Sequence, residues 1–384
     1  MKNANVRLCR VDDAAVSSVL REWQAEFPRM GVLALLPDAE AGNLPVLQES
    51  CRRQGVPLVG GIFPALVTDD GFAQSGVWLL RFDTMAPHFL LADVGLDHVA
   101  TAQRVAERTA AACQAMPPAT GRPTLYLIFD ALIQNTASML EELYLRLADQ
   151  VEYAGVASGS ETFEPVPCVF DGERVVDNGI LGLLLPGNVT TVLEHGFTAP
   201  SKVMTATATA GNRIVSIDWR PAFEVYREIM RSEFGIELTA ANFYEHAARF
   251  PFGILRANGE VIVRIPVSAT ADGSVYCIGE VAENAILFVL RAPVEDRGYC
   301  ARRLATRLQG AGGPLQCPLL VFYCAGRRLQ TREDALPELK RLGVAAGSDT
   351  LAGALSLGEI GSTNDGGYPL FHNATLVSTP WRPA

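Results

Sequence analysis

The sequence predicts an α/β fold of two related lobes, built on internally duplicated strand–helix–strand units with mixed sheets and antiparallel ribbons. Apolar segments of strand length alternate with segments of helical periodicity, a pattern typical of sheets that helices cover on both faces. The same order of segments occurs twice, which indicates an internal duplication. Hairpin-turn sequences between the two copies predict antiparallel ribbons at residues 168–220 and 252–280.

The duplication rests on five matching segments in each copy. The first copy has a strand, helix, strand, helix and strand at 89–92, 101–116, 125–129, 138–150 and 153–159. The second copy has the matching segments at 286–290, 299–309, 319–323, 332–341 and 343–348. We therefore expect residues 87–161 and 285–359 to follow the same path. Residues 32–60 resemble a third, partial copy.

Turn pairs mark the ribbons and help to place the boundary between the lobes. Asp171 with Gly172, and Asn258 with Gly259, are pairs that favour tight hairpin turns. Residues 261–265 alternate as a half-buried strand does. The lobes are predicted to span residues 1–215 and 216–384.

Composition excludes several classes of protein and partner. Of the 384 residues, 49% are hydrophobic and 19% charged, so the chain can bury an extensive core. The formal net charge of −10 disfavours nucleic acid and anionic membrane surfaces as partners. The apolar runs, such as 179–185, are far shorter than the roughly 20 residues that cross a bilayer. Eight scattered cysteines without a CxxC pair predict reduced thiols in a cytoplasmic protein.

Two glycine-rich segments, 155–161 and 343–349, each follow a predicted strand. Neither has the spacing of a dinucleotide-binding or phosphate-binding loop, so nucleotide binding is disfavoured. A ligand site at the strand ends and a tight structural turn both fit these segments. The same choice applies to the polar residues at 356–361 and 369–375, which could form a pocket or a hydrogen-bond network.

The sequence gives little support to catalysis. It contains no GxSxG or HExxH motif and no histidine–carboxylate pair at metal-ligand spacing. Ser158 and Cys324 could be nucleophiles at strand ends, but the sequence assigns no base to either. A binding protein is therefore favoured, and an enzyme that acts on a small molecule remains the alternative.

Several motifs resemble those of the FIST family. Residues 358–361 (GEIG) and 371–375 (FHNAT) are similar to the family's C-terminal signature. Further similar stretches lie at 250–254 with 263–266, at 321–327, and at 59–61 with 76–82. The first half departs from the pattern, because Ile62, Phe63 and Pro64 follow Gly61 where many members carry Gly-Glu-Ile.

The resemblance implies a sensory domain that binds a small molecule such as an amino acid. It also implies signalling to a separate partner, such as a histidine kinase of a two-component system or a cyclic-dinucleotide enzyme. On this view Arg264 would clamp a carboxylate, because its planar fork suits bidentate pairing. Glu359 would receive an ammonium group or orient His372, and Asn373 would complete the pocket.

Some stand-alone FIST proteins bind haem and sense nitric oxide, which gives a second expectation. Haem needs an axial ligand in an apolar pocket. His246 has Tyr244 and Phe250 nearby in the sequence, and Arg249 could meet a propionate. His195 precedes a glycine at a predicted strand end. Both are candidate metal ligands only if haem is bound, and the sequence leaves the choice between amino acid and haem open.

Overall fold

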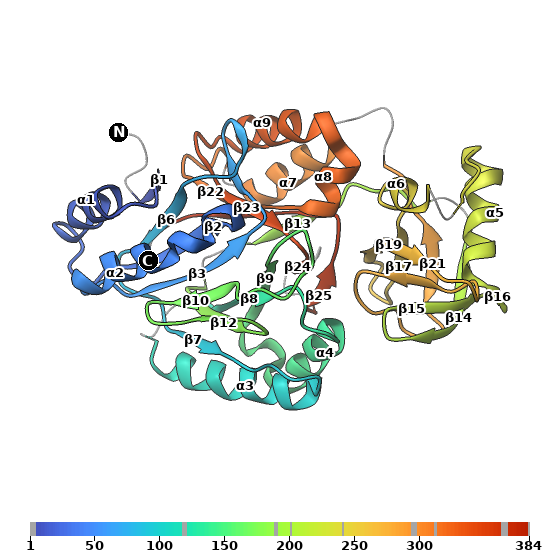
Figure 1. Cartoon of the computed structure of the whole chain (residues 1–384), viewed down its shortest axis with the longest axis horizontal. Coiled ribbons are helices and arrows are strands. Elements are labelled where there is room, and N and C mark those ends of the chain that lie inside the picture. Colours follow the sequence, from blue (N-terminus) through green and yellow to red (C-terminus); the bar gives the residue numbers. More distant parts are fainter. Residues whose placement is uncertain are drawn as a thin grey trace.

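The computed structural model describes residues 5–116, 121–187, 191–199, 202–239, 242–292, 298–310, 313–361 and 368–382. The strands of this part of the chain form four sheets. Three sheets pack around one core, and the fourth belongs to a separate body that projects to one side (Figure 1).

The three-sheet body consists of three units with the same order of elements. The first contains β1 (Val6–Cys9), α1 (Asp13–Gln24), β2 (Gly31–Pro37), α2 (Leu44–Arg53), β3 (Leu58–Phe63), β4 (Leu66–Thr68), β5 (Gly71–Ala73) and β6 (Val77–Phe82). The second contains β7 (His88–Leu91), α3 (His98–Gln114), β8 (Thr124–Asp130), α4 (Thr136–Leu147), β9 (Glu152–Ser158), β10 (Val169–Asp171), β11 (Val175–Val176) and β12 (Ile180–Leu185). The third contains β13 (Val192–Glu194), α7 (Tyr299–Gln309), β22 (Leu319–Cys324), α8 (Ala325–Thr331), α9 (Ala335–Ala346), β23 (Leu351–Ser356), β24 (Glu359–Gly361), β25 (Leu370–His372) and β26 (Leu376–Pro380).

Every unit has the same strand pairing. The central pairs β2–β3, β8–β9 and β22–β23 are parallel, so a helical crossover joins the two strands of each pair. The last strand of each unit (β6, β12 or β26) lies antiparallel to the first strand of the pair and to the unit's own first strand. The units are therefore three copies of one supersecondary structure.

Each unit also gives a hairpin to a neighbouring sheet. Strand β4 of the first unit pairs with β23, β10 of the second pairs with β3, and β24 of the third pairs with β9. The three exchanges form a closed cycle, because each unit gives one hairpin and receives one. No sheet of the three-unit body is therefore complete without strands from two units.

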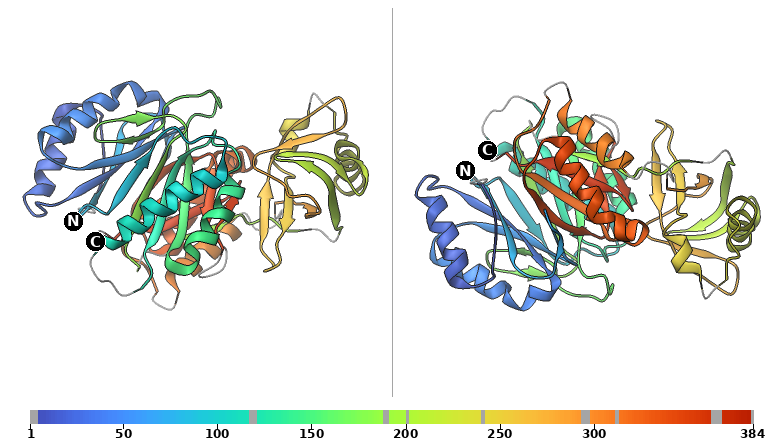
Figure 2. Two further views of the ribbon diagram at one scale, coloured as in Figure 1. Left: turned by 90° about the horizontal axis from the view of Figure 1, so that it is seen from below. Right: turned by 90° about the horizontal axis from the view of Figure 1, so that it is seen from above.

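The central strands are buried on both faces. In β8, Tyr126 and Ile128 face the core shared by the three sheets, while Leu125, Leu127 and Phe129 face helices α3 and α4. In the shared core, the ring of Phe322 lies 5.5 Å from that of Phe63 and 6.4 Å from that of Tyr126, measured between centroids. The helices cover the outside of this body (Figures 1 and 2).

The projecting body is inserted into the third unit, between β13 and α7. It contains β14 (Met204–Ala210), β15 (Arg213–Ile217), β16 (Arg220–Pro221), α5 (Ala222–Phe234), α6 (Phe243–Ala247), β17 (Phe252–Leu255), β18 (Val261–Arg264), β19 (Pro266–Ala269), β20 (Val275–Cys277) and β21 (Ile286–Val289). All its strand pairs are antiparallel, and α5 packs on the sheet through Tyr226 and Ile229. We call this part the inserted body.

The predicted α/β class, mixed sheets and antiparallel ribbons are confirmed, and Asn258 and Gly259 do form the turn between β17 and β18. The predicted repeat is correct for α7, β22 and α9 but wrong for its first and last strands. Residues 286–289 form β21 of the inserted body, and β13 takes the equivalent position in the third unit. An apolar strand before a helix has the same pattern in either place, so the sequence could not separate them.

Two further expectations are corrected. The partial copy expected at residues 32–60 is in fact complete: it is the first unit, which extends from β1 to β6. Residues 343–346 end helix α9 and Gly347 caps it with φ of 74°, so this glycine-rich segment is a helix terminus and not a loop after a strand. The predicted lobe boundary at 215 and 216 falls within β15 and stays a prediction.

Removing the central ring of the shared core should destabilise the whole three-unit body. We expect Phe322→Ala to lower the free energy of unfolding by about 3–5 kcal/mol, because it leaves a cavity where three sheets meet. Leu145→Ala, at an exposed position of α4, should change it by less than about 0.5 kcal/mol. Urea denaturation of both variants tests this, and a similar loss in both would contradict the shared core.

Candidate functional site

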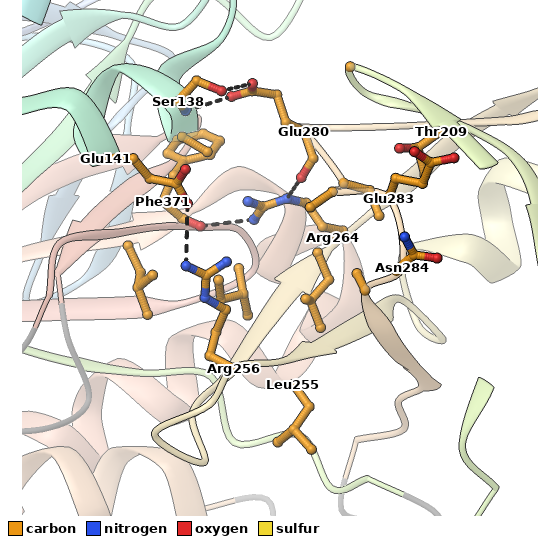
Figure 3. A pocket seen from close by; sticks show the side chains of 18 of the residues that line it. Ser138, Glu141, Thr209, Leu255, Arg256, Arg264, Glu280, Glu283, Asn284 and Phe371 are labelled. Carbon is orange, nitrogen blue, oxygen red and sulfur yellow. Dashed lines mark hydrogen bonds and ion pairs between the residues drawn. The ribbon is translucent and has the colours of Figure 1, made fainter. Parts of the chain in front are cut away.

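A cavity of about 380 Å³ lies between the inserted body and the second unit (Figure 3). One wall comes from α4 and from residues 368–371 at β25, and the other from β17, β18 and residues 280–285. Apolar side chains such as Leu255 and Ile262 line part of it, and charged side chains line the remainder. A concave space of this size with a few convergent polar groups is typical of a small-molecule site.

Arg264, at the end of β18, is the buried cation of this cavity. Its side chain is 2% exposed, and its Nε donates to the carbonyl of Glu280 at 2.9 Å. Its Nη1 donates to the carbonyls of Phe371 at 2.8 Å and Val263 at 3.1 Å. Among the described residues, no carboxylate forms an ion pair with it. Burial lowers the pKa of Arg264 to about 10, so the guanidinium is still charged at neutral pH.

Two polar contacts join the inserted body to α4 at the cavity. The carboxylate of Glu280 accepts from the backbone N–H of Ser138 at 3.1 Å and from its hydroxyl at 2.5 Å, in the first turn of α4. A carboxylate is favoured there by the positive end of the helix dipole. Arg256 forms an ion pair with Glu141 at 3.3 Å (Figure 3).

Glu359, the first residue of β24, lies in a buried cluster of polar side chains. Its carboxylate accepts from the hydroxyls of Ser356 at 2.6 Å and Thr375 at 2.5 Å. Burial raises the pKa of Glu359 to about 7, although these hydrogen bonds lower it. His372 is opposite Glu359 in the β24–β25 pair, and burial lowers the pKa of His372 to about 3, so its ring is neutral.

The four predicted pocket residues are not gathered in one cavity. Arg264 lines the cavity in Figure 3, whereas Asn373 lines a different one and Glu359 and His372 line neither. Within the described part of the chain, the amide of Asn373 has no hydrogen-bond partner. The ligand-binding roles of these residues stay predictions.

Sequence reasoning missed most of the cavity wall. The missed residues that carry polar groups include Ser138, Glu141, Arg256, Glu280, Glu283 and Asn284. They come from a helix of the second unit and two loops of the inserted body, which meet only through the tertiary packing. The one available signal was the hairpin at Asn258 and Gly259, which places Arg256 in the turn after β17 and Arg264 at the end of β18.

The two histidines proposed as metal ligands have different surroundings. His195 lines a cavity of about 510 Å³ between the inserted body and the third unit. Its Nδ1 accepts from the N–H of Phe197 at 3.0 Å, and burial, with Arg327 and Arg303 nearby, lowers its pKa to about 4. His246, in the short helix α6, is half-buried and lines neither this cavity nor the Arg264 cavity. No three His, Cys, Asp or Glu side chains of the described residues gather as a metal site.

The two candidate nucleophiles, Ser158 and Cys324, each form a hydrogen bond with a backbone group. Ser158 is buried and donates to the carbonyl of Phe129 at 3.1 Å. Cys324 is buried and its sulfur accepts from the N–H of Ala374 at 3.1 Å, and burial strongly raises the pKa of its thiol. A thiol with a raised pKa is a poor nucleophile.

In the described part of the chain, no helix has the length and apolarity needed to cross a bilayer.

Ionisation of Glu359 should make stability depend on pH. Its pKa is raised in the folded state, so the protonated form is favoured there and stability falls as pH rises from about 4.5 to about 7. Glu359→Gln cannot ionise, so its stability relative to wild type should increase by roughly 3 kcal/mol across that interval. Urea denaturation of both proteins at several pH values tests this. A constant difference between them would show that Glu359 does not ionise in this interval.

Comparison with known sequences places the whole architecture in a family. No curated protein matches the chain. The model of the FIST N domain matches residues 32–220, which hold most of the first unit, the second unit and the first strands of the inserted body. The model of the FIST C domain matches residues 222–362, from α5 to β24. FIST domains are generally regarded as sensory, ligand-binding domains, and the chain belongs to the FIST family.

Proposed function

We propose that this protein is a cytoplasmic sensor that binds a small molecule with both a carboxylate and an ammonium group in the Arg264 cavity and signals to a separate protein. The observation that carries the proposal is Arg264, a buried guanidinium on the cavity wall without an ion-pair partner among the described residues. A buried charge is costly unless it is paired, and a bound carboxylate would pair it. Eight free thiols, mostly buried, support a cytoplasmic location.

The other walls suit the remainder of an amino-acid-like ligand. Glu283 and Glu141 line the same cavity and could receive an ammonium group. Leu255 and Ile262 offer apolar contact to a side chain. This role for Glu283 and Glu141 replaces the one expected of Glu359, which lies in its own cluster with Ser356 and Thr375.

The position of the cavity suggests how a signal would leave it. The inserted body joins the third unit at both of its ends, and polar contacts such as Glu280 with Ser138 hold it against the second unit. A ligand that binds one arrangement of the two bodies better than another shifts the population between them. A partner such as a histidine kinase or a cyclic-dinucleotide enzyme could recognise the favoured arrangement.

Amino-acid binding should depend on Arg264. In a panel of the common amino acids, we expect at least one to raise the thermal midpoint in a dose-dependent way, by preferential binding to the folded state. Arg264→Gln should lower the affinity for that amino acid by at least about tenfold. The corresponding amine, which lacks the carboxylate, should not bind to wild type. Arg231→Gln, at an exposed position of α5, is the matched control and should bind normally.

Two results would contradict this proposal. Equal binding by wild type and Arg264→Gln would move the site elsewhere. Chemical conversion of the ligand, lost in Arg264→Gln, would favour the alternative of an enzyme. A sensor should instead return the ligand unchanged after long incubation.

Haem is the second candidate ligand, and His195 is the observation that favours it. Its neutral, oriented imidazole suits an axial ligand, and Arg249 and Arg291 in the same cavity could meet propionates. The remaining walls do not fit the apolar faces of a porphyrin, because Glu233, Asp334 and Glu338 also line the cavity. We therefore favour the amino-acid-like ligand over haem and nitric oxide sensing.

An absorption spectrum separates the two candidates. We expect the protein mixed with haem to show only the broad absorption of loosely adsorbed porphyrin, because charged walls would oppose insertion. A sharp Soret band that responds to nitric oxide would overturn this expectation. Loss of such a band in His195→Ala would place haem in the His195 cavity, and loss in His246→Ala would place it at α6. His88→Ala, at an exposed position, is the control.

A further inference from the structure

A separate cavity of about 320 Å³ lies where the second unit, the third unit and the inserted body meet. It has no lining residue in common with the Arg264 cavity. Most of its walls are apolar or aromatic, from Phe163, Tyr244, Ala248, Ile265, Ile278, Ala325, Leu329 and Leu357. The cavity is large enough for a small ring compound, and its walls favour an apolar one.

The amide of Asn373 is the unsatisfied polar group of this cavity. Asn373 is 1% exposed, and within the described residues neither its amide nitrogen nor its amide oxygen has a hydrogen-bond partner. A buried polar group without a partner costs free energy that a bound donor or acceptor would recover. The amide offers both a donor and an acceptor, so it matches a group that presents the two side by side.

The backbone next to Asn373 is held in place from two sides. Ala374 has φ of 54°, a left-handed conformation that alanine rarely adopts. Its N–H donates to the sulfur of Cys324 at 3.1 Å, and its carbonyl accepts from Nη1 of Arg327 at 3.3 Å. The surrounding structure therefore imposes the position of Asn373, as is common where a binding group is preorganised.

The charges at this cavity cancel. Nη2 of Arg328 donates to both carboxylate oxygens of Glu161 at 2.6 and 2.7 Å, and both residues line the cavity. The pair leaves no net charge to attract an ionic ligand. An uncharged ligand therefore fits this site better than an acid or an amine.

We propose that this cavity is a second binding site, which takes an uncharged aromatic molecule that carries a carboxamide. The carboxamide pairs with the amide of Asn373, donor to acceptor and acceptor to donor. The ring packs against the apolar walls near Ile265 and Leu357. The ligand class differs from that of the Arg264 cavity, so the two sites can be tested independently.

Benzamide is the probe for this site, with benzoate and ethylbenzene as its charged and purely apolar counterparts. We expect isothermal titration calorimetry and thermal midpoints to show binding of benzamide at millimolar concentration and much weaker binding of the other two. Asn373→Leu should lower the affinity for benzamide at least about tenfold, since it removes two hydrogen bonds to the carboxamide. Asn43→Leu makes the same exchange at an exposed position and should bind benzamide as wild type does.

A second variant keeps the test independent of how Asn373→Leu folds. Ala248→Phe places a ring in the cavity, so it should abolish benzamide binding while the thermal midpoint stays the same or rises. Equal benzamide affinity in wild type, Asn373→Leu and Ala248→Phe would overturn the proposal. Failure of wild type to bind millimolar benzamide would also overturn it, and water would then be the partner of the Asn373 amide.

Discussion

The constraint on which this structure depends is the pairing of the exposed edge of each parallel strand pair. Strands β3, β9 and β23 each have one edge that their own unit leaves unpaired, and backbone groups at such an edge need partners. The partner is always a hairpin from another unit, as when Leu66 and Val67 pair with Ala354 and Gly353. The cycle of exchanges therefore holds the three units together through backbone hydrogen bonds as well as through the shared apolar core.

The same constraint positions the polar groups of both proposed sites. The hairpin β24–β25 lies beside β9 because Glu359 pairs with Val156. That hairpin brings the carbonyl of Phe371 to Arg264 in one cavity, and the chain that follows it presents Asn373 in another. By contrast, the buried pair of Arg327 and Glu338 is fully bonded at 2.7 and 2.8 Å and serves the packing of the third unit. Arg264 has no ion pair and the Asn373 amide no hydrogen bond among the described residues, and both line cavities, so these two groups are the ones to which we assign ligands.

The sequence predicted the local structure better than the assembly. Alternating burial makes segments such as 125–129 apolar throughout, and this pattern correctly predicted β8 and its covering helices. The pattern carries no information on which sheet a short hairpin joins, so the exchange of β4, β10 and β24 could not be foreseen. For the same reason the sequence placed β21 in the repeat, although an inserted body separates β13 from α7.

The site was predictable only where a single residue had an unusual chemistry for its position. Arg264, a cation at the end of an apolar strand, does line a cavity. Glu283 and Ser138 belong to ordinary polar segments, and only the contact of the inserted body with α4 makes them neighbours. The choice of Glu359 followed from its sequence proximity to His372. The two residues are directly opposite each other in the β24–β25 pair, but Ser356 and Thr375 hold the carboxylate of Glu359 in a buried cluster away from the Arg264 cavity.

The exchange of hairpins also has a consequence for synthesis of the protein. Strand β4 is made early, yet its partner β23 follows almost the whole of the chain. On the ribosome, the hairpin of β4 and β5 therefore has no partner strand until the last unit has emerged. Contacts between such distant segments close large loops and slow folding. The nascent chain exposes an unpaired strand edge during that interval, and such edges are prone to aggregation until their partner strand arrives.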